Sequence, residues 1–318
     1  MGRYVLRRLL LTIPMLVAVT AVIFGLLQFT PGDPLDAFIP PGAALLPAQR
    51  AALRHALGLD RPLPLRYLFW LRNTVEGNLG FRTTNFQPVS QAIGQHIGPT
   101  LLLMACGMGM GIIAGLVFGV ISAVRRGTVL DVVLTVTAMA GISVPAFLAG
   151  LVGLYVFSVN LHWFPAGGLA TPGQPFSLGD RIAHLFLPAS LLSLNYAAII
   201  MRYTRASMLE IMHEDFIRTA RAKGLRESAV RIAHTFRNAL LPVVTVIGAQ
   251  VPNLLGGAVF LETIFSWPGM GELFLGAVQA RDFNLIMGIS LILAIAILLS
   301  NLATDLAYAA IDPRIRLG

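Results

Sequence analysis

The amino-acid sequence predicts an all-α membrane protein that crosses the bilayer six times. Of its 318 residues, 56% are hydrophobic and only 12% are charged, whereas a soluble globular domain carries about 25% charged residues. Six stretches are apolar enough, and long enough, to cross the hydrocarbon core as helices, which takes about 20 residues each. Basic residues gather in alternate connections between these stretches. The composition therefore excludes a soluble protein. The net charge of +8 points to the membrane surface, not to nucleic acid.

The six predicted spans differ in how they begin and end. The first follows a cluster of arginines, as a secretory signal does, but its apolar run is longer than a signal and no Ala-x-Ala cleavage site ends it. We therefore expect it to be retained. In the third span, Ser143 and Pro145 predict a kink. The spans are residues 9–28, 100–124, 132–157, 184–201, 239–260 and 284–309.

The arginines predict the orientation, because basic residues near the ends of spans stay on the cytoplasmic side. Only Arg181 and Arg281 lie in the third-to-fourth and fifth-to-sixth connections, and the first outer loop is too long for the rule to apply. Both termini are therefore expected to be cytoplasmic. The basic residues on the expected cytoplasmic side are Arg3, Arg7, Arg8, Arg125, Arg126, Arg202, Arg205, Arg218, Arg221, Lys223, Arg226, Arg231, Arg237, Arg314 and Arg316.

The chain divides into three parts: an N-terminal segment with the first span (1–29), a long outer loop (30–99) and a core of five spans (100–318). Two short helices are expected in the loop. One begins at Pro47 and stops at Gly58, and the other begins at Pro64 and ends before Gly77. Tyr67 and Trp70 in the second helix suit either an anchor at headgroup level or packing beneath the loop.

The connection between the fourth and fifth spans, residues 202–238, carries the most specific local pattern. Asp215 suits the positive N-terminal end of a short helix, Lys223 its negative C-terminal end, and Gly224 the left-handed residue beyond it. So short a helix needs something to dock against. A basic loop held inside by charge alone would leave these caps unexplained. A second, basic helix is expected over 227–238. The apolar face of the first helix is expected to hold Phe216, Ile217 and Ala220.

Residues 218–224 (RTARAKG) and 237–242 (RNALLP) resemble the coupling segment of permease subunits in bacterial binding-protein-dependent ABC importers. The distance from Gly224 to Pro242 and the absence of a glutamate at the first position are typical of the peptide/nickel branch. The whole chain is most similar to the type B subunit of dipeptide and oligopeptide importers. Further matching segments are 7–14 (RRLLLTIP), 31–34 (PGDP), 64–67 (PLRY), 262–269 (ETIFSWPG), 280–282 (ARD) and 312–317 (DPRIRL).

This resemblance implies a type I ABC importer permease fold in the bacterial inner membrane, surrounded by lipids. It also implies a heterodimer with a second homologous permease, two cytoplasmic ATPase subunits that bind ATP and Mg²⁺, and a periplasmic or lipid-anchored binding protein. Peptides would be imported by alternating access, or in the alternative a nickel chelate, glutathione or another small solute. The residues it assigns to coupling are Asp215, Phe216, Ile217, Arg218, Thr219, Ala220, Arg221, Ala222, Lys223 and Gly224.

Polar residues within spans are costly and therefore merit attention. They are candidates either for the lining of the transport pathway or for hydrogen bonds between helices. Glycines at every fourth position of the second span allow another helix backbone to approach closely, within this bundle or in the contact between permeases. The polar candidates are Asn195, Tyr196, Gln250, Asn253 and Asn301, and the glycines are Gly107, Gly111, Gly115 and Gly119.

The connection between the fifth and sixth spans is apolar but too short to span. Pro268 and Gly269 form a turn pair, after which residues 271–280 can form a short helix. The resemblance places this segment at the outer mouth of the pathway, where Phe265, Trp267, Pro268 and Gly269 would form a gate. The alternative is an interfacial anchor made by Phe265 and Trp267.

Catalysis and metal binding have little support in the sequence. Lys223 is the only lysine and is followed by Gly224 and Leu225, which excludes a P-loop ending in Gly-Lys-Ser/Thr. Cys106 is the only cysteine, and the six histidines are scattered. We therefore expect no metal, no cofactor and no enzymatic activity in this chain. The competing class, an ATP-independent channel or carrier, does not explain a capped helix that needs a partner.

Overall fold

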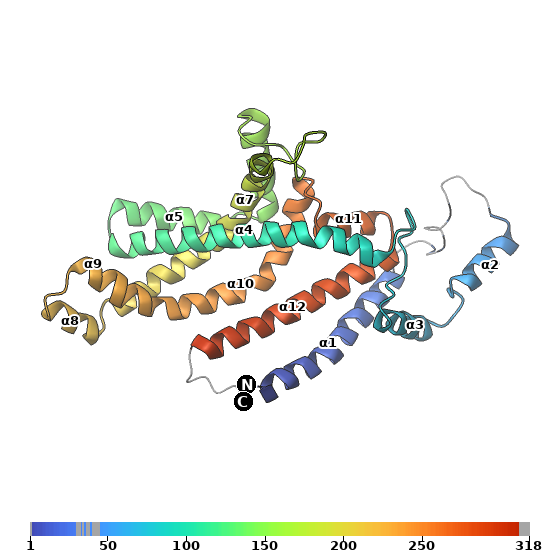
Figure 1. Cartoon of the computed structure of the whole chain (residues 1–318), viewed down its shortest axis with the longest axis horizontal. Helices are drawn as coiled ribbons and strands as arrows, with labels where there is room; N and C mark the ends of the chain where they lie inside the picture. Colours follow the sequence, from blue (N-terminus) through green and yellow to red (C-terminus); the bar gives the residue numbers. More distant parts are fainter. Residues whose placement is uncertain (1, 30–32, 34, 36–38, 40–44, 312–318) are drawn as a thin grey trace. The chain divides into compact units, whose positions relative to one another are not determined.

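The computed structural model describes the backbone of residues 2–29, 33, 35, 39 and 45–311, and their side chains except at 2–5, 251–255 and 307–311. Helices make up nearly all of the regular structure in this part of the chain (Figure 1). The chain forms two compact units, each built from segments distant in sequence. One comprises Met1–Gly98 and Gly269–Leu299, and the other Pro99–Pro268 and Ser300–Gly318.

The first unit packs the outer loop around the beginnings of two long helices. It contains α1 (Gly2–Gln28), α2 (Pro47–Ala56), α3 (Leu63–Val75), the start of α4 (Val89–Val124), α11 (Met270–Gln279) and the start of α12 (Phe283–Ile311). Val89 and Ile93 of α4 pack with Leu273 of α11 and Leu285 of α12 in its apolar core.

Both short helices expected in the outer loop are present. α2 begins at Pro47 and is followed by Gly58 at φ +66°, and α3 is followed by Gly77 at φ +84°. The Tyr67 hydroxyl donates to Val17 O at 2.9 Å and also contacts Thr20 Oγ1 at 2.9 Å. Tyr67 therefore packs α3 against α1, as one of the two alternatives predicted.

The second unit is built around α7 (Leu178–Ile211). The other elements wholly within it are α5 (Val129–Ser143), α6 (Ala146–Gly153), the π-helix η2 (Leu154–Asn160), α8 (Asp215–Ala222), α9 (Glu227–Ala229), the π-helix η3 (Val230–Phe236) and α10 (Arg237–Ile264). Leu192, Tyr196 and Ile200 of α7 are buried in its main apolar core with Val243 and Leu261 of α10.

Five single helices of the described chain are long and apolar enough to cross a membrane, and a sixth span exists if one bent pair is counted. The five are Leu6–Gln28, Val89–Val124, Leu178–Ile211, Glu227–Gln250 and Phe283–Leu306, and the pair is Val129–Ser143 with Ala146–Asn160, bent by 105°. The third predicted span is therefore not one continuous helix. The break falls at Val144 and Pro145, because proline lacks an N–H donor and forces the preceding residue out of the helical conformation.

The glycine stripe of α4 packs against α7. A Cβ added to Gly115 would lie 2.7 Å from Ile200 Cβ and 2.9 Å from the backbone oxygen of Ala197. A Cβ on Gly119 would lie 2.6 Å from Thr204 Cβ, and Gly107 and Gly111 face the same helix. The predicted use of these glycines within the helix bundle is confirmed.

Candidate functional site

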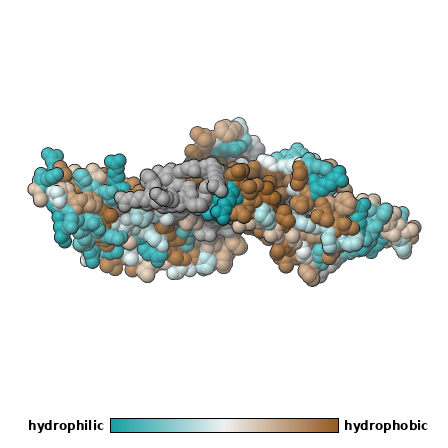
Figure 2. Space-filling view, turned by 90° about the horizontal axis from the view of Figure 1, so that it is seen from below, coloured by the Kyte–Doolittle hydropathy of each residue, from teal (hydrophilic) through white to brown (hydrophobic). Residues whose placement is uncertain are grey.

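The segment predicted to couple this chain to a partner forms a separate short helix. α8 runs from Asp215 to Ala222, and its last turn ends at Gly224, which has φ +78°. The Gly224 N–H donates to Arg221 O at 2.9 Å. This left-handed residue was predicted from the sequence, because only glycine adopts it without strain. In Figure 2, hydrophilic residues are frequent at the left, where Figure 1 places α8 and α9.

Two side chains attach α8 to the rest of the second unit. Ile217 and Ala220 are buried against Val230 of η3, with Ile211 at the end of α7 packed beside them. An ion pair reinforces the contact, since Glu227 of α9 accepts from Arg221 Nε at 2.8 Å. Glu227 also lies 3.4 Å from Arg231 Nε of η3. The basic helix expected over 227–238 is present, with η3 as its central part.

The apolar face of α8 is narrower than predicted. Phe216 was expected to share it with Ile217 and Ala220, but its side chain is 44% exposed. The reason is that Ile211 and Val230 cover only the stripe at Ile217 and Ala220, while Phe216 lies about 100° around the helix from Ile217. Every residue of α8 except Ile217 and Ala220 is exposed. We call the exposed side chains of Phe216, Arg218, Thr219, Arg221 and Ala222 the α8 surface.

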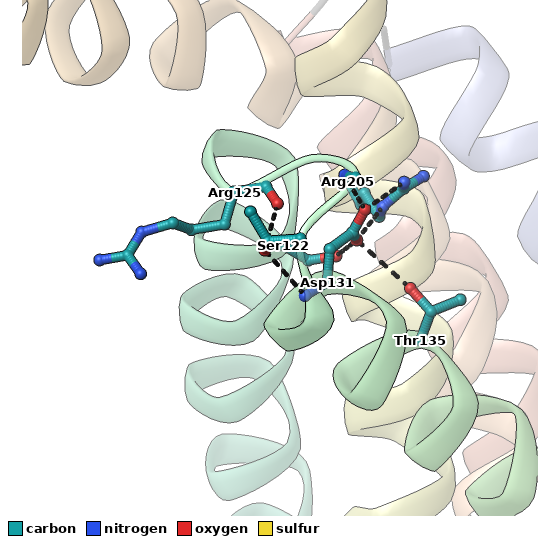
Figure 3. Close-up of polar contacts among 7 residues, drawn as sticks. Ser122, Arg125, Asp131, Thr135 and Arg205 are labelled. Carbon is teal, nitrogen blue, oxygen red and sulfur yellow. Dashed lines mark hydrogen bonds and ion pairs between the residues drawn. The ribbon is translucent and has the colours of Figure 1, made fainter.

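An ion pair joins the buried Asp131 of α5 to the partly buried Arg205 of α7 (Figure 3). Arg205 Nε donates to Asp131 Oδ1 at 2.8 Å, and Arg205 Nη2 donates to Asp131 Oδ2 at 2.9 Å. Gly127 N–H donates to Oδ2 at 2.9 Å, and the Ser122 hydroxyl donates to Oδ1. Asp131 is 4% exposed. The carboxylate is therefore fully hydrogen-bonded, as a buried charge must be.

This network ties the end of α4 and the start of α5 to α7. α7 ends at Ile211, and α8 begins at Asp215. The ion pair thus fixes the helix that carries α8. Sequence reasoning missed it and treated Arg205 only as a marker of orientation. Thr128 Oγ1 accepts from Asp131 N–H as the N-cap of α5, a local pattern that marks the start of the helix and not the pairing with Arg205.

The five candidate pathway residues have different environments. Tyr196 is buried in the core around α7, and a Cβ on Gly257 of α10 would lie 3.7 Å from its hydroxyl. Asn195 and Gln250 are half-buried, and Asn301 is exposed. Asn253 is among the residues whose side chains lie outside the described part. Tyr196 therefore contributes to packing between helices, whatever its further role.

The aromatic residues predicted for the outer gate are buried. Phe265 is 1% exposed and Trp267 is 0% exposed, both within the core of the second unit. Trp267 Nε1 donates to Pro99 O at 3.0 Å, and Phe265 O accepts from Gly168 N–H at 2.8 Å. The alternative of an interfacial anchor is wrong, because neither side chain reaches the surface. Gly269 is the N-cap of α11, and this helix confirms the one expected over 271–280.

The described residues offer no site for a metal ion, because their His, Cys, Asp and Glu side chains nowhere form a group of three that could hold one. What the arrangement provides is an exposed helix, α8, that packs on Val230 and Ile211 and follows a helix, α7, that the Asp131–Arg205 ion pair holds in place.

Comparison with known proteins points to one family. Residues 115–317 match the family model described as binding-protein-dependent transport system inner membrane component, and residues 1–90 match a model for the N-terminal part of such components. A protein of Brucella suis biovar 1, named provisionally as a peptide permease, is 54% identical over 317 residues, with 99% of each chain covered. The oligopeptide transport system permease protein AppB of Bacillus subtilis is 40% identical, again over 99% of each chain.

The fold also resembles a solved structure. A chain of the MetNI methionine ABC transporter, in a crystal form described as inward facing, superposes with a TM-score of 0.56 at 18% sequence identity. The match covers 70% of this chain and 97% of that one. At this identity the similarity concerns the fold alone.

Proposed function

This chain belongs to the family of binding-protein-dependent transport system inner membrane components, and on that premise we propose that it imports peptides by alternating access. It is a multi-pass, non-catalytic permease subunit of a peptide-type ABC importer in the bacterial inner membrane. The observation that carries this assignment is the match of residues 115–317 to the family. The family match gives no support to the alternative of an ATP-independent channel or carrier. Peptide as the substrate follows the names of the relatives.

The proposed complex contains a second homologous permease, two ATPase subunits that bind ATP and Mg²⁺, and a periplasmic or lipid-anchored binding protein. The α8 surface is the proposed contact with one ATPase subunit. Its side chains are exposed while Ile217 and Ala220 hold the helix in place. Closure of the ATPase dimer would move α8 as a rigid body and reach the spans through α7. This is a two-state element biased by ATP.

Substrate uptake into vesicles containing the full complex tests the substrate class. A labelled di- or oligopeptide is expected to accumulate only when ATP is present on the side of the membrane that carries the ATPase subunits and the binding protein is present on the other side. Accumulation of glutathione or of a nickel chelate, with no uptake of peptides, would move the assignment to the corresponding alternative within the same importer class.

Gly224→Val is expected to reduce transport and substrate-stimulated ATPase activity severalfold while leaving insertion intact. No atom lies within 4 Å of a Cβ built at this position, so the side chain has room. The backbone does not tolerate it, because φ is +78° and left-handed conformations cost a residue with a Cβ roughly 1–2 kcal/mol. Val is worse because its β-branch restricts the backbone further.

Gly224→Asn is the matched control, since asparagine is the residue that best tolerates this conformation after glycine. It should retain most of the activity. Wild-type transport by Gly224→Val, at equal amounts of complex, would contradict the coupling assignment.

We place both termini and the α8 surface on the cytoplasmic side, because the basic residues follow that pattern. Single cysteines in a Cys106→Ala background should be labelled from the inner side near Arg126 and Arg226. They should be labelled from the outer side near Arg61 and Gly269. Labelling of position 226 from outside intact cells would overturn this orientation.

Phe265, Trp267, Pro268 and Gly269 are the proposed outer gate, and Asn195, Tyr196, Gln250, Asn253 and Asn301 remain the proposed pathway lining. Trp267→Ala is expected to raise basal ATPase activity or substrate leak. Truncating a fully buried aromatic side chain costs about 3–5 kcal/mol, and the hydrogen bond to Pro99 O is lost as well. The measurements are ATPase activity and leak of labelled substrate from vesicles without binding protein.

Trp163→Ala is the control, because this tryptophan is 64% exposed. It should change neither readout. If Trp267→Ala lowers only the unfolding temperature and leaves activity per folded complex unchanged, Trp267 is a packing residue and the gate assignment fails.

A further inference from the structure

The first unit contains a cavity of about 380 Å³ between the end of α1, the α2–α3 segment and the start of α12. This volume lies in the range of small-molecule sites, about 300–1,000 Å³. Phe24 and Gln28 of α1, Phe69 and Trp70 of α3, and Asn284 and Met287 of α12 are among its lining residues.

Two arginines, Arg61 and Arg66, line this cavity, and among the described residues no Asp or Glu lines it. His55, which also lines it, contacts Asp60 Oδ2 through Nδ1 at 2.7 Å. Arg66 Nη1 donates to a neutral acceptor, Gln28 Oε1, at 3.1 Å, and no carboxylate of the described residues forms an ion pair with it. Burial lowers the pKa of Arg66, and the nearby Arg54 lowers it further. A half-buried cation without a counter-ion favours the binding of an anion.

Aromatic and apolar side chains form much of the remaining wall, together with the neutral polar residues Gln28, Asn73, Thr83 and Asn284. One of the aromatic residues has an unused donor. Arg61 stacks over the Phe69 ring, with 4.3 Å from Cζ to the ring centroid. Trp70 Nε1 is buried and has no hydrogen-bond partner within the described structure. A ligand with one acidic group and an apolar body would fit both the arginines and the aromatic walls.

The position of the cavity favours a lipid over a soluble anion. It lies at the C-terminal end of the α1 span (Leu6–Gln28) and the N-terminal end of the α12 span (Phe283–Leu306). The ends of spans are at the level of the lipid headgroups. Val22 and Leu26, near that end of α1, are 62% and 63% exposed. They offer an apolar surface for acyl chains next to the cavity.

We propose that this cavity binds the headgroup of an anionic phospholipid, with Arg61 and Arg66 at the phosphate and the acyl chains along Val22 and Leu26. The bound lipid would attach the outer loop to the membrane at α3. This inference depends only on residues of the first unit and is independent of the transported substrate.

The test measures phosphatidylglycerol retained by the full-length chain, purified with its partner subunits in mild detergent, by native mass spectrometry. Arg66→Gln should lower retention roughly tenfold, the size expected for the loss of a charge-assisted hydrogen bond. Arg72→Gln is the matched control on the same helix, because Arg72 pairs with Glu76 at 2.9 Å and does not line the cavity. It should retain the lipid.

Equal retention by Arg66→Gln and the wild type, or equal retention of phosphatidylcholine, would overturn the proposal. A second measurement is the unfolding temperature of the complex in phosphatidylcholine nanodiscs. If inorganic phosphate or a short peptide raises this temperature as much as phosphatidylglycerol does, the cavity binds a soluble ligand instead. Should Arg66→Gln fail to fold, photoactivatable phosphatidylglycerol must label Leu63–Val75 of the wild type more strongly than the phosphatidylcholine analogue does. Equal labelling would also refute it.

Discussion

Arg205→Leu is expected to destabilise the permease toward the lower end of the about 3–5 kcal/mol that breaking a fully buried ion pair costs, because the Arg205 side chain is 28% exposed. The substitution leaves the Asp131 carboxylate 6% exposed without its counter-ion. The donors Ser122 and Gly127 remain and keep the loss at the lower end of that range. The measurement is the unfolding temperature of the purified complex, followed by size-exclusion chromatography after heating.

The same variant should also uncouple ATP hydrolysis from transport, because α7 connects the ion pair to α8. Arg202→Leu is the control, since Arg202 is exposed on the same helix one turn earlier. It should alter neither stability nor coupling. The double variant Asp131→Leu/Arg205→Leu should recover part of the stability, because it leaves no unpaired charge. A stable, fully coupled Arg205→Leu variant would show that the ion pair has no role in supporting α8.

Gly115→Ala combined with Gly119→Ala is expected to separate α4 from α7 and to lower the yield of folded permease sharply. Each added methyl group would meet backbone atoms, with Ala197 O at 2.9 Å from one and Met201 O at 2.9 Å from the other. Backbone cannot turn away as a flexible side chain can. Overpacking of this kind costs about 1–3 kcal/mol per site. The double variant is expected to cost more than either single one but less than their sum, because both substitutions act on one helix contact.

Gly109→Ala supplies the control on the same helix. No atom lies within 4 Å of a Cβ at this position, so the substitution should be neutral or stabilise the helix by up to about 1 kcal/mol. The comparison uses the amount of monodisperse permease per milligram of membrane protein. Similar yields for the double variant and for Gly109→Ala would mean that close approach of α4 and α7 is not required.

Features with a local physical cause were predictable from the sequence. The spans follow from the length and apolarity of each stretch, since the bilayer thickness dictates both. α8 was predicted between Asp215 and Gly224 because its end depends on a residue that tolerates positive φ. The break near Pro145 follows from the missing N–H and from the restriction on the preceding residue. The face of the glycine stripe follows from its spacing of four residues.

Features that depend on which segments meet were decided only by the tertiary structure. Asp131 and Arg205 are 74 positions apart, and no local pattern specifies that pairing. Phe216 is exposed because the cover over α8 comes from Ile211 and Val230, in segments before and after it. The 105° angle at the break of the third span depends on packing, because proline permits a bend without setting its size. The cavity at Arg66 exists because helices from both ends of the chain converge there. Local sequence sets propensities and ends, whereas contacts between distant segments decide burial and charge pairing.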